Sequence, residues 1–433
     1  MKKIIKNQRK SILTAAVLLM GVILIVFSSK NTSAAKVKPA KLPAKQHIKV
    51  DEFFDYMGKK FKIKKEGDKT YRDYITEDNP YFYAGVPDGK GTVTNEIAGY
   101  LLYGAYFYYY PDETDDDSMY HFVDYYKRVH DIKKAKYKYR EAIKHIFGYG
   151  IMAGYSKGRY THSRDFRPKK KITKDEMKLY VARLMDKKKR VPMSRDGQVL
   201  RTKNLPKKAK YYEYILESFP NKYYDRRWAF EVWEGVKKKG IDIIYPKDYR
   251  FDDGSMGEGY MKRVFDASSD MWIKKATDNM MMRFNVDYRT IKKDKKWYRK
   301  LYHSYYVFED GRSAGQEKAI KPYIKQVIKN KVRIVGKVDT DKSSIYQSIG
   351  AMVIRFHVKF KVISAKDMNP EKIFYSEMGK VGIVMKPIKK GVWYDRIYEV
   401  ELGSPVMCDF QDHAVHTDEL VDWDWYDKTV LGK

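Results

Sequence analysis

Cysteine is almost absent from this sequence. Its 433 residues contain a single cysteine, Cys408, so no disulfide bond can form within the chain. Small exported domains that lack a large core commonly depend on disulfides, which form in oxidising compartments. The count therefore excludes a disulfide-stabilised scaffold. For an exported chain of this length, it favours a Gram-positive-type bacterial exterior over a eukaryotic secretory route.

Acidic residues are also scarce relative to basic ones. The chain has 56 Asp and Glu against 88 Lys and Arg, which gives a formal net charge of +32. A charge of this size attracts polyanions. Nucleic acid, acidic cell-wall polymer and a membrane surface all remain open as partners, because charge alone does not choose between them.

Several common catalytic motifs are missing. The sequence contains no phosphate-binding G-x-x-x-x-G-K-[ST], no G-x-G-x-x-G after a strand and no H-E-x-x-H. Cys408 has only His413 as a nearby base in sequence, so a small buried side chain is the preferred interpretation. We therefore predict no catalytic residue and no cofactor, and we expect a binding role instead of an enzyme.

One cluster near the C-terminus has metal-ligand chemistry. His413 and His416 are three residues apart, and Asp409, Asp412 and Asp418 flank them. A helix would bring the two imidazoles together, but an exposed acidic tail explains the same residues equally well. We assign no metal site, and zinc binding by His413 and His416 stays an open alternative.

Long apolar runs are lacking except at the start of the chain. Residues 12–27 form an apolar stretch behind a basic segment, and Ser33, Ala34 and Ala35 follow as small residues. This order is typical of a signal peptide, which we place at residues 1–35. Export makes nucleic acid an unsuitable partner. Membrane contact is expected only through this segment if it stays uncleaved, and residues 36–50 read as a basic linker.

The most informative stretch covers residues 141–186. It predicts a helix, a glycine-rich turn and a second helix with its own start signal. Thr173 and Glu176 form the T-x-x-E pattern of a capping box before the second apolar stripe. The letters and spacing of the turn resemble the S-layer homology motif. Matching positions are Gly150, Ile151, Gly154, Tyr155, Gly158, Tyr160, Pro168, Ile172, Thr173, Lys174 and Glu176.

The stretch departs from the motif at three points. Lys157 replaces the usual Asp, Lys174 replaces the favoured Arg, and the loop from Tyr160 to Pro168 is longer than usual. The resemblance implies an exported protein held non-covalently on the cell wall by an anionic secondary cell-wall polysaccharide. It places the binding residues at Thr173 and Lys174, with Gly154 in the turn. We add Tyr155, whose ring lies in the same turn and is able to stack on a sugar.

The resemblance and the local patterns divide the chain into parts. Residues 51–190 are expected to be all-α, with helix-loop-helix repeats: a clear copy at 141–186 and a degenerate copy at about 81–110, where Thr94 starts a helix. Residues 191–259 are a helical connector or an eroded third repeat. This connector includes a helix through Tyr211, Tyr214, Ile215 and Leu216.

Residues 260–433 are expected to form an α+β domain. Helices are predicted at 260–282, 297–308 and 316–329. Strands follow at 332–338, 352–363, 380–385 and 393–402, and alternation in the second strand predicts one buried and one wet face. This element order is similar to an NTF2-like cone. The role of the domain stays open. A wall-located enzyme with its site there, and a structural protein that binds polyanions nonspecifically, are the two alternatives.

Overall fold

The computed structural model describes residues 47–113, 117–228, 260–305, 319–348, 351–376, 383–403, 414–416 and 420–421. The predicted signal peptide, most of the linker, residues 229–259 of the connector, Cys408 and His413 lie outside these residues. Among the described residues, no helix is both long enough and apolar enough to cross a membrane.

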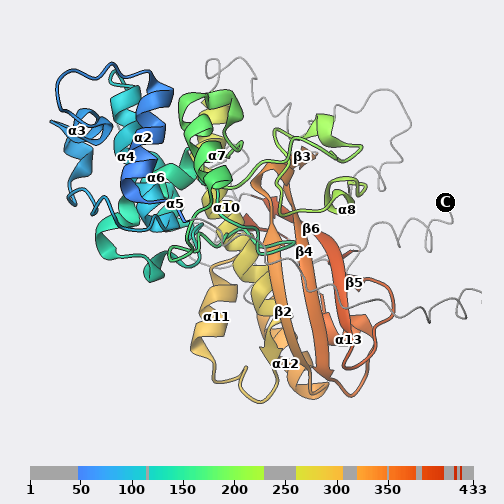
Figure 1. The fold of residues 1–433 in the computed structure, drawn as a ribbon. Helices are drawn as coiled ribbons and strands as arrows, with labels where there is room; N and C mark the ends of the chain where they lie inside the picture. Colours follow the sequence, from blue (N-terminus) through green and yellow to red (C-terminus); the bar gives the residue numbers. More distant parts are fainter. Residues whose placement is uncertain are drawn as a thin grey trace, which may run out of the picture. The chain divides into compact units, whose positions relative to one another are not determined.

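The N-terminal region is helical, as predicted. Its α-helices are α2 (Val50–Phe61), α3 (Tyr71–Thr76), α4 (Asn95–Tyr109), α5 (Asp117–Tyr125), α6 (Arg140–Gly148) and α7 (Lys174–Met185). The predicted start of a helix at Thr94 is confirmed, because Thr94 is the N-cap residue of α4. Figure 1 shows these helices in blue to green.

Helix α4 lies at the centre of this region, with residues 98–107 all buried. Its small residues allow the close approach of neighbours: a Cβ added to Gly104 would lie 2.4 Å from the ring of Phe82. Aromatic side chains fill the space on either side, and the rings of Tyr81 and Phe107 stack with centroids 3.7 Å apart. An apolar helix that is buried all round belongs inside a core.

The connector differs from the prediction. Tyr211, Tyr214, Ile215 and Leu216 do not form an α-helix. Instead a 3-10 turn spans Ala209–Tyr211, and Leu216 pairs with Leu200 in an antiparallel bridge. A short helix, α8 (Asn221–Tyr224), follows Pro220. The aromatic and aliphatic side chains of this segment pack against a sheet in the C-terminal region, so tertiary contacts override the helical spacing.

The C-terminal region has helices followed by an antiparallel sheet, which confirms the α+β expectation in this coarse form. The helices before the main strands are α10 (Tyr260–Phe284), α11 (Lys295–Tyr302) and α12 (Lys321–Lys329), with the short strand β1 (Val286–Asp287) between α10 and α11. The main strands are β2 (Arg333–Thr340), β4 (Ala351–Ser364) and β6 (Trp393–Gly403), with the sheet order β1-β2-β4-β6-β7. The shorter strands are β1, β3 (Tyr346–Ser348), which pairs with β4, and β7 (Ala414–Val415). Two further strands, β5 (Ile383–Val384) and β8 (Leu420–Val421), pair in parallel, and α13 (Pro370–Phe374) precedes them.

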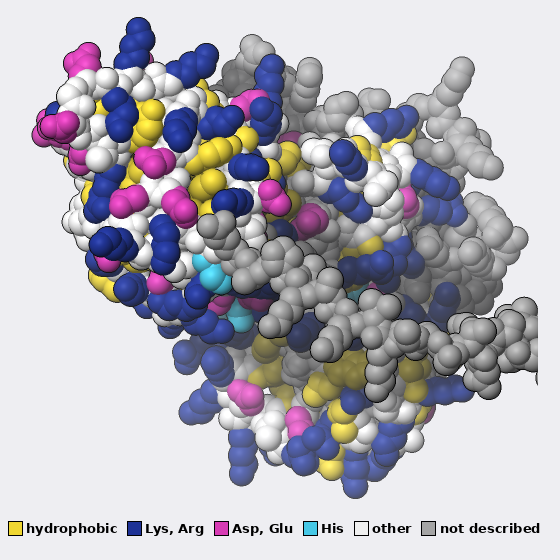
Figure 2. All heavy atoms as spheres, in the orientation of Figure 1, with side chains coloured by type: hydrophobic (Ala, Val, Ile, Leu, Met, Phe, Trp, Pro, Cys, Tyr) yellow, Lys and Arg dark blue, Asp and Glu magenta, His cyan; other side chains and the backbone are white. Residues whose placement is uncertain are grey.

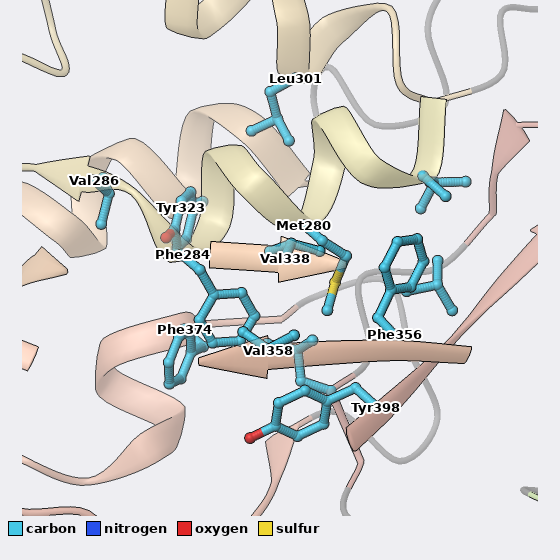
Figure 3. Close-up of a cluster of buried hydrophobic side chains, with 14 of the residues drawn as sticks. Met280, Phe284, Val286, Leu301, Tyr323, Val338, Phe356, Val358, Phe374 and Tyr398 are labelled. Atoms are coloured by element: carbon cyan, nitrogen blue, oxygen red, sulfur yellow. The ribbon is translucent and has the colours of Figure 1, made fainter. Parts of the chain in front are cut away.

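One face of the sheet packs against α10. Figure 3 shows Met280 and Phe284 of α10 beside Phe356 and Val358 of β4. These side chains are fully buried, and the ring of Phe284 lies 4.9 Å from that of Phe374. The alternating apolar positions of β4 therefore form the core face, as the sequence indicates.

The opposite face of β4 is exposed to solvent along only part of its length. Lys359 is exposed, but Arg355 is fully buried. The connector covers this end of the face, and its residues Tyr212 and Tyr223 contact Arg355. The guanidinium of Arg355 donates to the hydroxyl oxygen of Tyr212 at 3.0 Å and to the carbonyl oxygen of Tyr223 at 2.8 Å.

A buried ion pair completes this contact. Arg355 donates from Nε and Nη2 to one carboxylate oxygen of Glu399 on β6, at 2.9 and 2.6 Å. The other oxygen of Glu399 accepts from the hydroxyl of Tyr346 at 2.7 Å. Both charged side chains are almost inaccessible. Such a pair tolerates burial only because every charged atom finds a partner.

We expect Glu399→Gln to reduce the free energy of unfolding by about 3–5 kcal/mol, because it leaves the Arg355 guanidinium buried without a counter-charge. Urea unfolding monitored by tryptophan fluorescence measures this loss. Glu401→Gln is the matched control. Glu401 lies two residues along the same strand, and its ion pair with His416 is about half exposed, so its loss should stay below about 1 kcal/mol. Equal losses in the two variants would contradict the assigned role of Glu399.

Candidate functional site

The turn after α6 contains two glycines that no other residue replaces without strain. Gly150 and Gly154 have φ values of +71° and +63°. A Cβ at Gly150 would lie 2.1 Å from the carbonyl oxygen of Val191, and one at Gly154 would lie 2.8 Å from that of Asp165. Positive φ and close backbone approach both require glycine here.

A short antiparallel pairing holds the residue after Gly154 in place. The backbone N–H of Tyr155 donates to the carbonyl of Asp165 at 2.8 Å, and the N–H of Asp165 donates back at 3.0 Å. Arg164 supports the same turn from outside, donating to the carbonyl oxygens of Ala153 and Gly154 at 2.6 and 3.1 Å. The backbone at Tyr155 is thus fixed from both sides.

The side chain of Tyr155 points to helix α7. Its hydroxyl donates to Glu176 at 3.2 Å and accepts from Lys170 at 2.7 Å. The guanidinium of Arg167 lies 4.1 Å from the ring centroid, a cation–π distance. One ring face is therefore already engaged by Arg167.

Thr173 caps α7 as the sequence predicts. Its hydroxyl accepts from the N–H of Glu176 at 3.2 Å, and its own N–H donates to the Glu176 carboxylate at 3.0 Å. Glu176 also pairs with Lys170. Burial raises the pKa of Glu176, but the hydrogen bonds from Lys170 and from the Thr173 backbone outweigh it, and the pKa lies below its ordinary value.

These contacts bring together three of the four predicted site residues. Gly154 and Tyr155 lie in the turn, and Thr173 joins them through the shared carboxylate of Glu176. Lys174, the first residue of α7, is exposed. It does not line the cavity that lies beside Gly154 and Tyr155.

That cavity has a volume of about 310 Å³ and contains groups that the sequence analysis did not single out. Arg164 and Arg183 line it, as do Glu176 and Tyr180. The Nε of Arg183 is buried and has no hydrogen-bond partner within the described structure, and burial lowers the pKa of this guanidinium. Glu176, Tyr180 and Arg183 stand at i, i+4 and i+7, so their shared helix face was readable from the sequence.

The end of the same loop closes over the start of α4. The N–H groups of Asn95 and Glu96 donate to the carbonyl oxygens of Lys170 and Pro168 at 2.8 and 3.0 Å. The Glu96 carboxylate, which is buried, pairs with Lys169 at 2.7 Å. These donors at the start of α4 are therefore used inside the protein, whereas Thr173 starts a helix beside an open cavity.

The metal alternative at His413 and His416 is not tested, because His413 lies outside the described residues. Across the part of the chain that the structure describes, no three His, Cys, Asp or Glu side chains are placed to hold a metal ion.

Comparison with protein families matches residues 130–178 to the S-layer homology domain. The matched range includes the glycine turn, Tyr155, the capping box of α7 and Glu176. Comparison with curated proteins found no match, and comparison with solved structures found none either. The match does not extend to the predicted degenerate copies, which stay a prediction.

The pH dependence of stability tests the role of Glu176. Its pKa is lowered by folding, so its stabilising contribution is fully present above the unfolded value of 4.5 and is lost as pH falls through the lower folded pKa. We expect Glu176→Gln to lower the melting temperature at pH 7, consistent with about 1 kcal/mol for a lost cap, and to flatten its decline below pH 4.5. Thermal melts at pH 3 to 7 measure both effects. The control is Asp175→Asn, one residue away, which should keep the wild-type pH profile. If it behaves like Glu176→Gln, the pH dependence comes from negative charge at the helix terminus in general and not from the contacts of Glu176.

Proposed function

Because residues 130–178 form an S-layer homology domain, which indicates non-covalent attachment to the cell surface, we propose that this protein is exported and held on the bacterial cell wall by an anionic polysaccharide. The predicted signal peptide at residues 1–35 supplies the export step. The C-terminal α+β domain, for which an NTF2-like cone remains our proposal, is then presented at the surface.

The cavity beside the glycine turn carries this proposal. Ligand pockets of roughly 300–1,000 Å³ are typical of small-molecule sites, and this one is about 310 Å³, the size of one or two sugar rings. Its walls combine the apolar Met152 and Leu179 with the guanidinium of Arg183. Arg164 also lines the cavity, but its guanidinium is paired with Glu217 and bonded to two backbone carbonyls. Apolar surface suits the faces of a sugar, and a guanidinium binds a carboxylate in a planar, two-bonded geometry.

Each of the four predicted site residues has a different role in this proposal. Gly154 leaves room for the chain of Asp165, and Thr173 fixes the direction of α7. Tyr155 holds Glu176 and Lys170 at the edge of the cavity. Lys174 stands at the positive end of the α7 dipole and adds a charge there, where an anionic substituent is stabilised. Lysine in place of arginine at this position offers a point charge without the two-bonded geometry.

We expect Lys174→Ala to weaken binding of purified wall polysaccharide roughly three- to ten-fold, the net value of one ordinary hydrogen bond of about 1 kcal/mol. Sedimentation with wall polysaccharide at 0.15 M salt measures it. Lys178→Ala, four residues along α7 and also exposed, removes the same charge and should bind within twofold of wild type. Equal capture of wild type and Lys174→Ala would contradict the assignment of Lys174 as a polysaccharide-binding residue. Indifference to removal of acidic ketal groups, with a steep loss in salt, would favour the nonspecific polyanion alternative.

Arg183 provides a second test, in which charge is conserved. Arg183→Lys keeps the positive charge but loses the planar guanidinium, and we expect about tenfold weaker binding of the same polysaccharide. Arg190→Lys is the control: Arg190 donates to the carbonyl oxygens of Arg183 and Leu184 but does not line the cavity. Both variants lose backbone hydrogen bonds, so equal loss of binding would point to stability and contradict a contact role for Arg183.

A further inference from the structure

A second, strongly cationic cavity lies between helices α10 and α11, outside the S-layer homology domain. Its volume is about 410 Å³. Six of the eight residues that line it are lysine or arginine. These six are Lys274, Lys275, Lys295, Lys296, Arg299 and Lys300, and His303 and Asp278 complete the lining. In Figure 2 dark-blue Lys and Arg side chains gather over the position of α11.

Among the described residues that line this cavity, Asp278 is the single carboxylate, and it is already engaged. Asp278 pairs with Lys274 of its own helix at 2.7 Å and with Lys300 of α11 at 3.2 Å. Its side chain is 19% exposed, which places it at the floor between the two helices. Asp278 therefore joins the helices through Lys274 and Lys300, and the described lining holds no second carboxylate for Lys295, Lys296 and Arg299.

The cationic face of α11 is held toward the cavity by the opposite face of the helix. Trp297 and Leu301 are buried in the core, and the Trp297 indole N–H donates to the carbonyl of Met282 at 2.9 Å. On this cationic face, Lys296 stands four residues before Lys300, and Lys295 stands four residues before Arg299. Like charges at this spacing destabilise a helix by about 0.2–0.5 kcal/mol per pair. Bound anions would remove that cost.

We propose that this cavity binds the phosphate groups of a phosphodiester polymer. The lysine side chains present compact charges with three donors each, and lysine binds phosphate as a point charge. One carboxylate would compensate one of the six cations. A polymer with a negative charge in every repeat places several negative charges in the same cavity. The inference rests on α10 and α11 alone and does not require polysaccharide binding at α7.

The test compares two triple variants of the full chain that each remove three positive charges. The cavity variant is Lys295→Gln, Lys296→Gln and Arg299→Gln, which leaves the pair of Lys300 with Asp278 intact. The control variant is Lys187→Gln, Lys188→Gln and Lys189→Gln, in an exposed 3-10 turn away from this cavity. The probe is soluble poly(glycerol phosphate), titrated calorimetrically at 0.15 M salt. We expect the cavity variant to bind at least tenfold more weakly than wild type, and the control less than threefold.

Melting temperatures give a second readout. Without polymer, the cavity variant should melt at the wild-type temperature or above it, because like-charge repulsion is relieved. With polymer, wild type and control should gain stability through ligand binding while the cavity variant should not. If the triple variant unfolds, Lys296→Gln alone replaces it in both measurements.

Two results would overturn the proposal. Equal weakening in the two triple variants would show that only net charge attracts the polymer. Equally tight binding of polygalacturonate, a carboxylate polymer, would show that the cavity does not prefer phosphate. Lys174→Ala should bind poly(glycerol phosphate) like wild type, so a failure at this cavity is distinguishable from a failure at α7.

Discussion

The carboxylate of Glu176 is the interaction on which the repeat depends. One oxygen caps α7 through the backbone N–H of Thr173, and the other takes hydrogen bonds from Tyr155 and Lys170. A single side chain thus joins the start of one helix to the turn that follows another. Because Tyr155 is also fixed by backbone pairing to Asp165, the wall of the adjacent cavity is determined by residues that already stabilise the fold. The same contacts therefore stabilise the repeat and shape the cavity.

The buried pair of Arg355 and Glu399 plays a similar part in the C-terminal region. It lies on the sheet face opposite α10, where the connector supplies the hydroxyl of Tyr212 and the carbonyl of Tyr223. A charge pair of this kind is costly to bury unless its partners are complete. The connector is therefore part of the fold of the sheet, and more than a tether between two domains.

The net charge of +32 is unevenly used. Near the start of α7, two cations are engaged by neighbours: Lys170 pairs with Glu176, and Arg167 stacks over the ring of Tyr155. Between α10 and α11 the described lining of the cavity has six lysine and arginine residues and one carboxylate, Asp278, which pairs with Lys274 and Lys300. Positive charge that is compensated locally shapes a site, whereas positive charge left in excess attracts a polyanion.

The sequence by itself determined the all-α character of the N-terminal region, the helix starts at Thr94 and Thr173, the glycine turn and the change from helices to strands near residue 330. These features depend on local spacing, on φ at glycine and on alternation along a strand. Only the tertiary structure decided the rest. The spacing of Tyr211 to Leu216 is helical, yet Tyr211 ends a 3-10 turn, Leu216 pairs in a bridge, and the segment packs against the sheet. Arg164 and Arg183 enter the cavity because the loop folds back on α7, and Arg355 is buried because a distant segment covers it. Such contacts join residues that lie tens to hundreds of positions apart, and no local pattern carries that information.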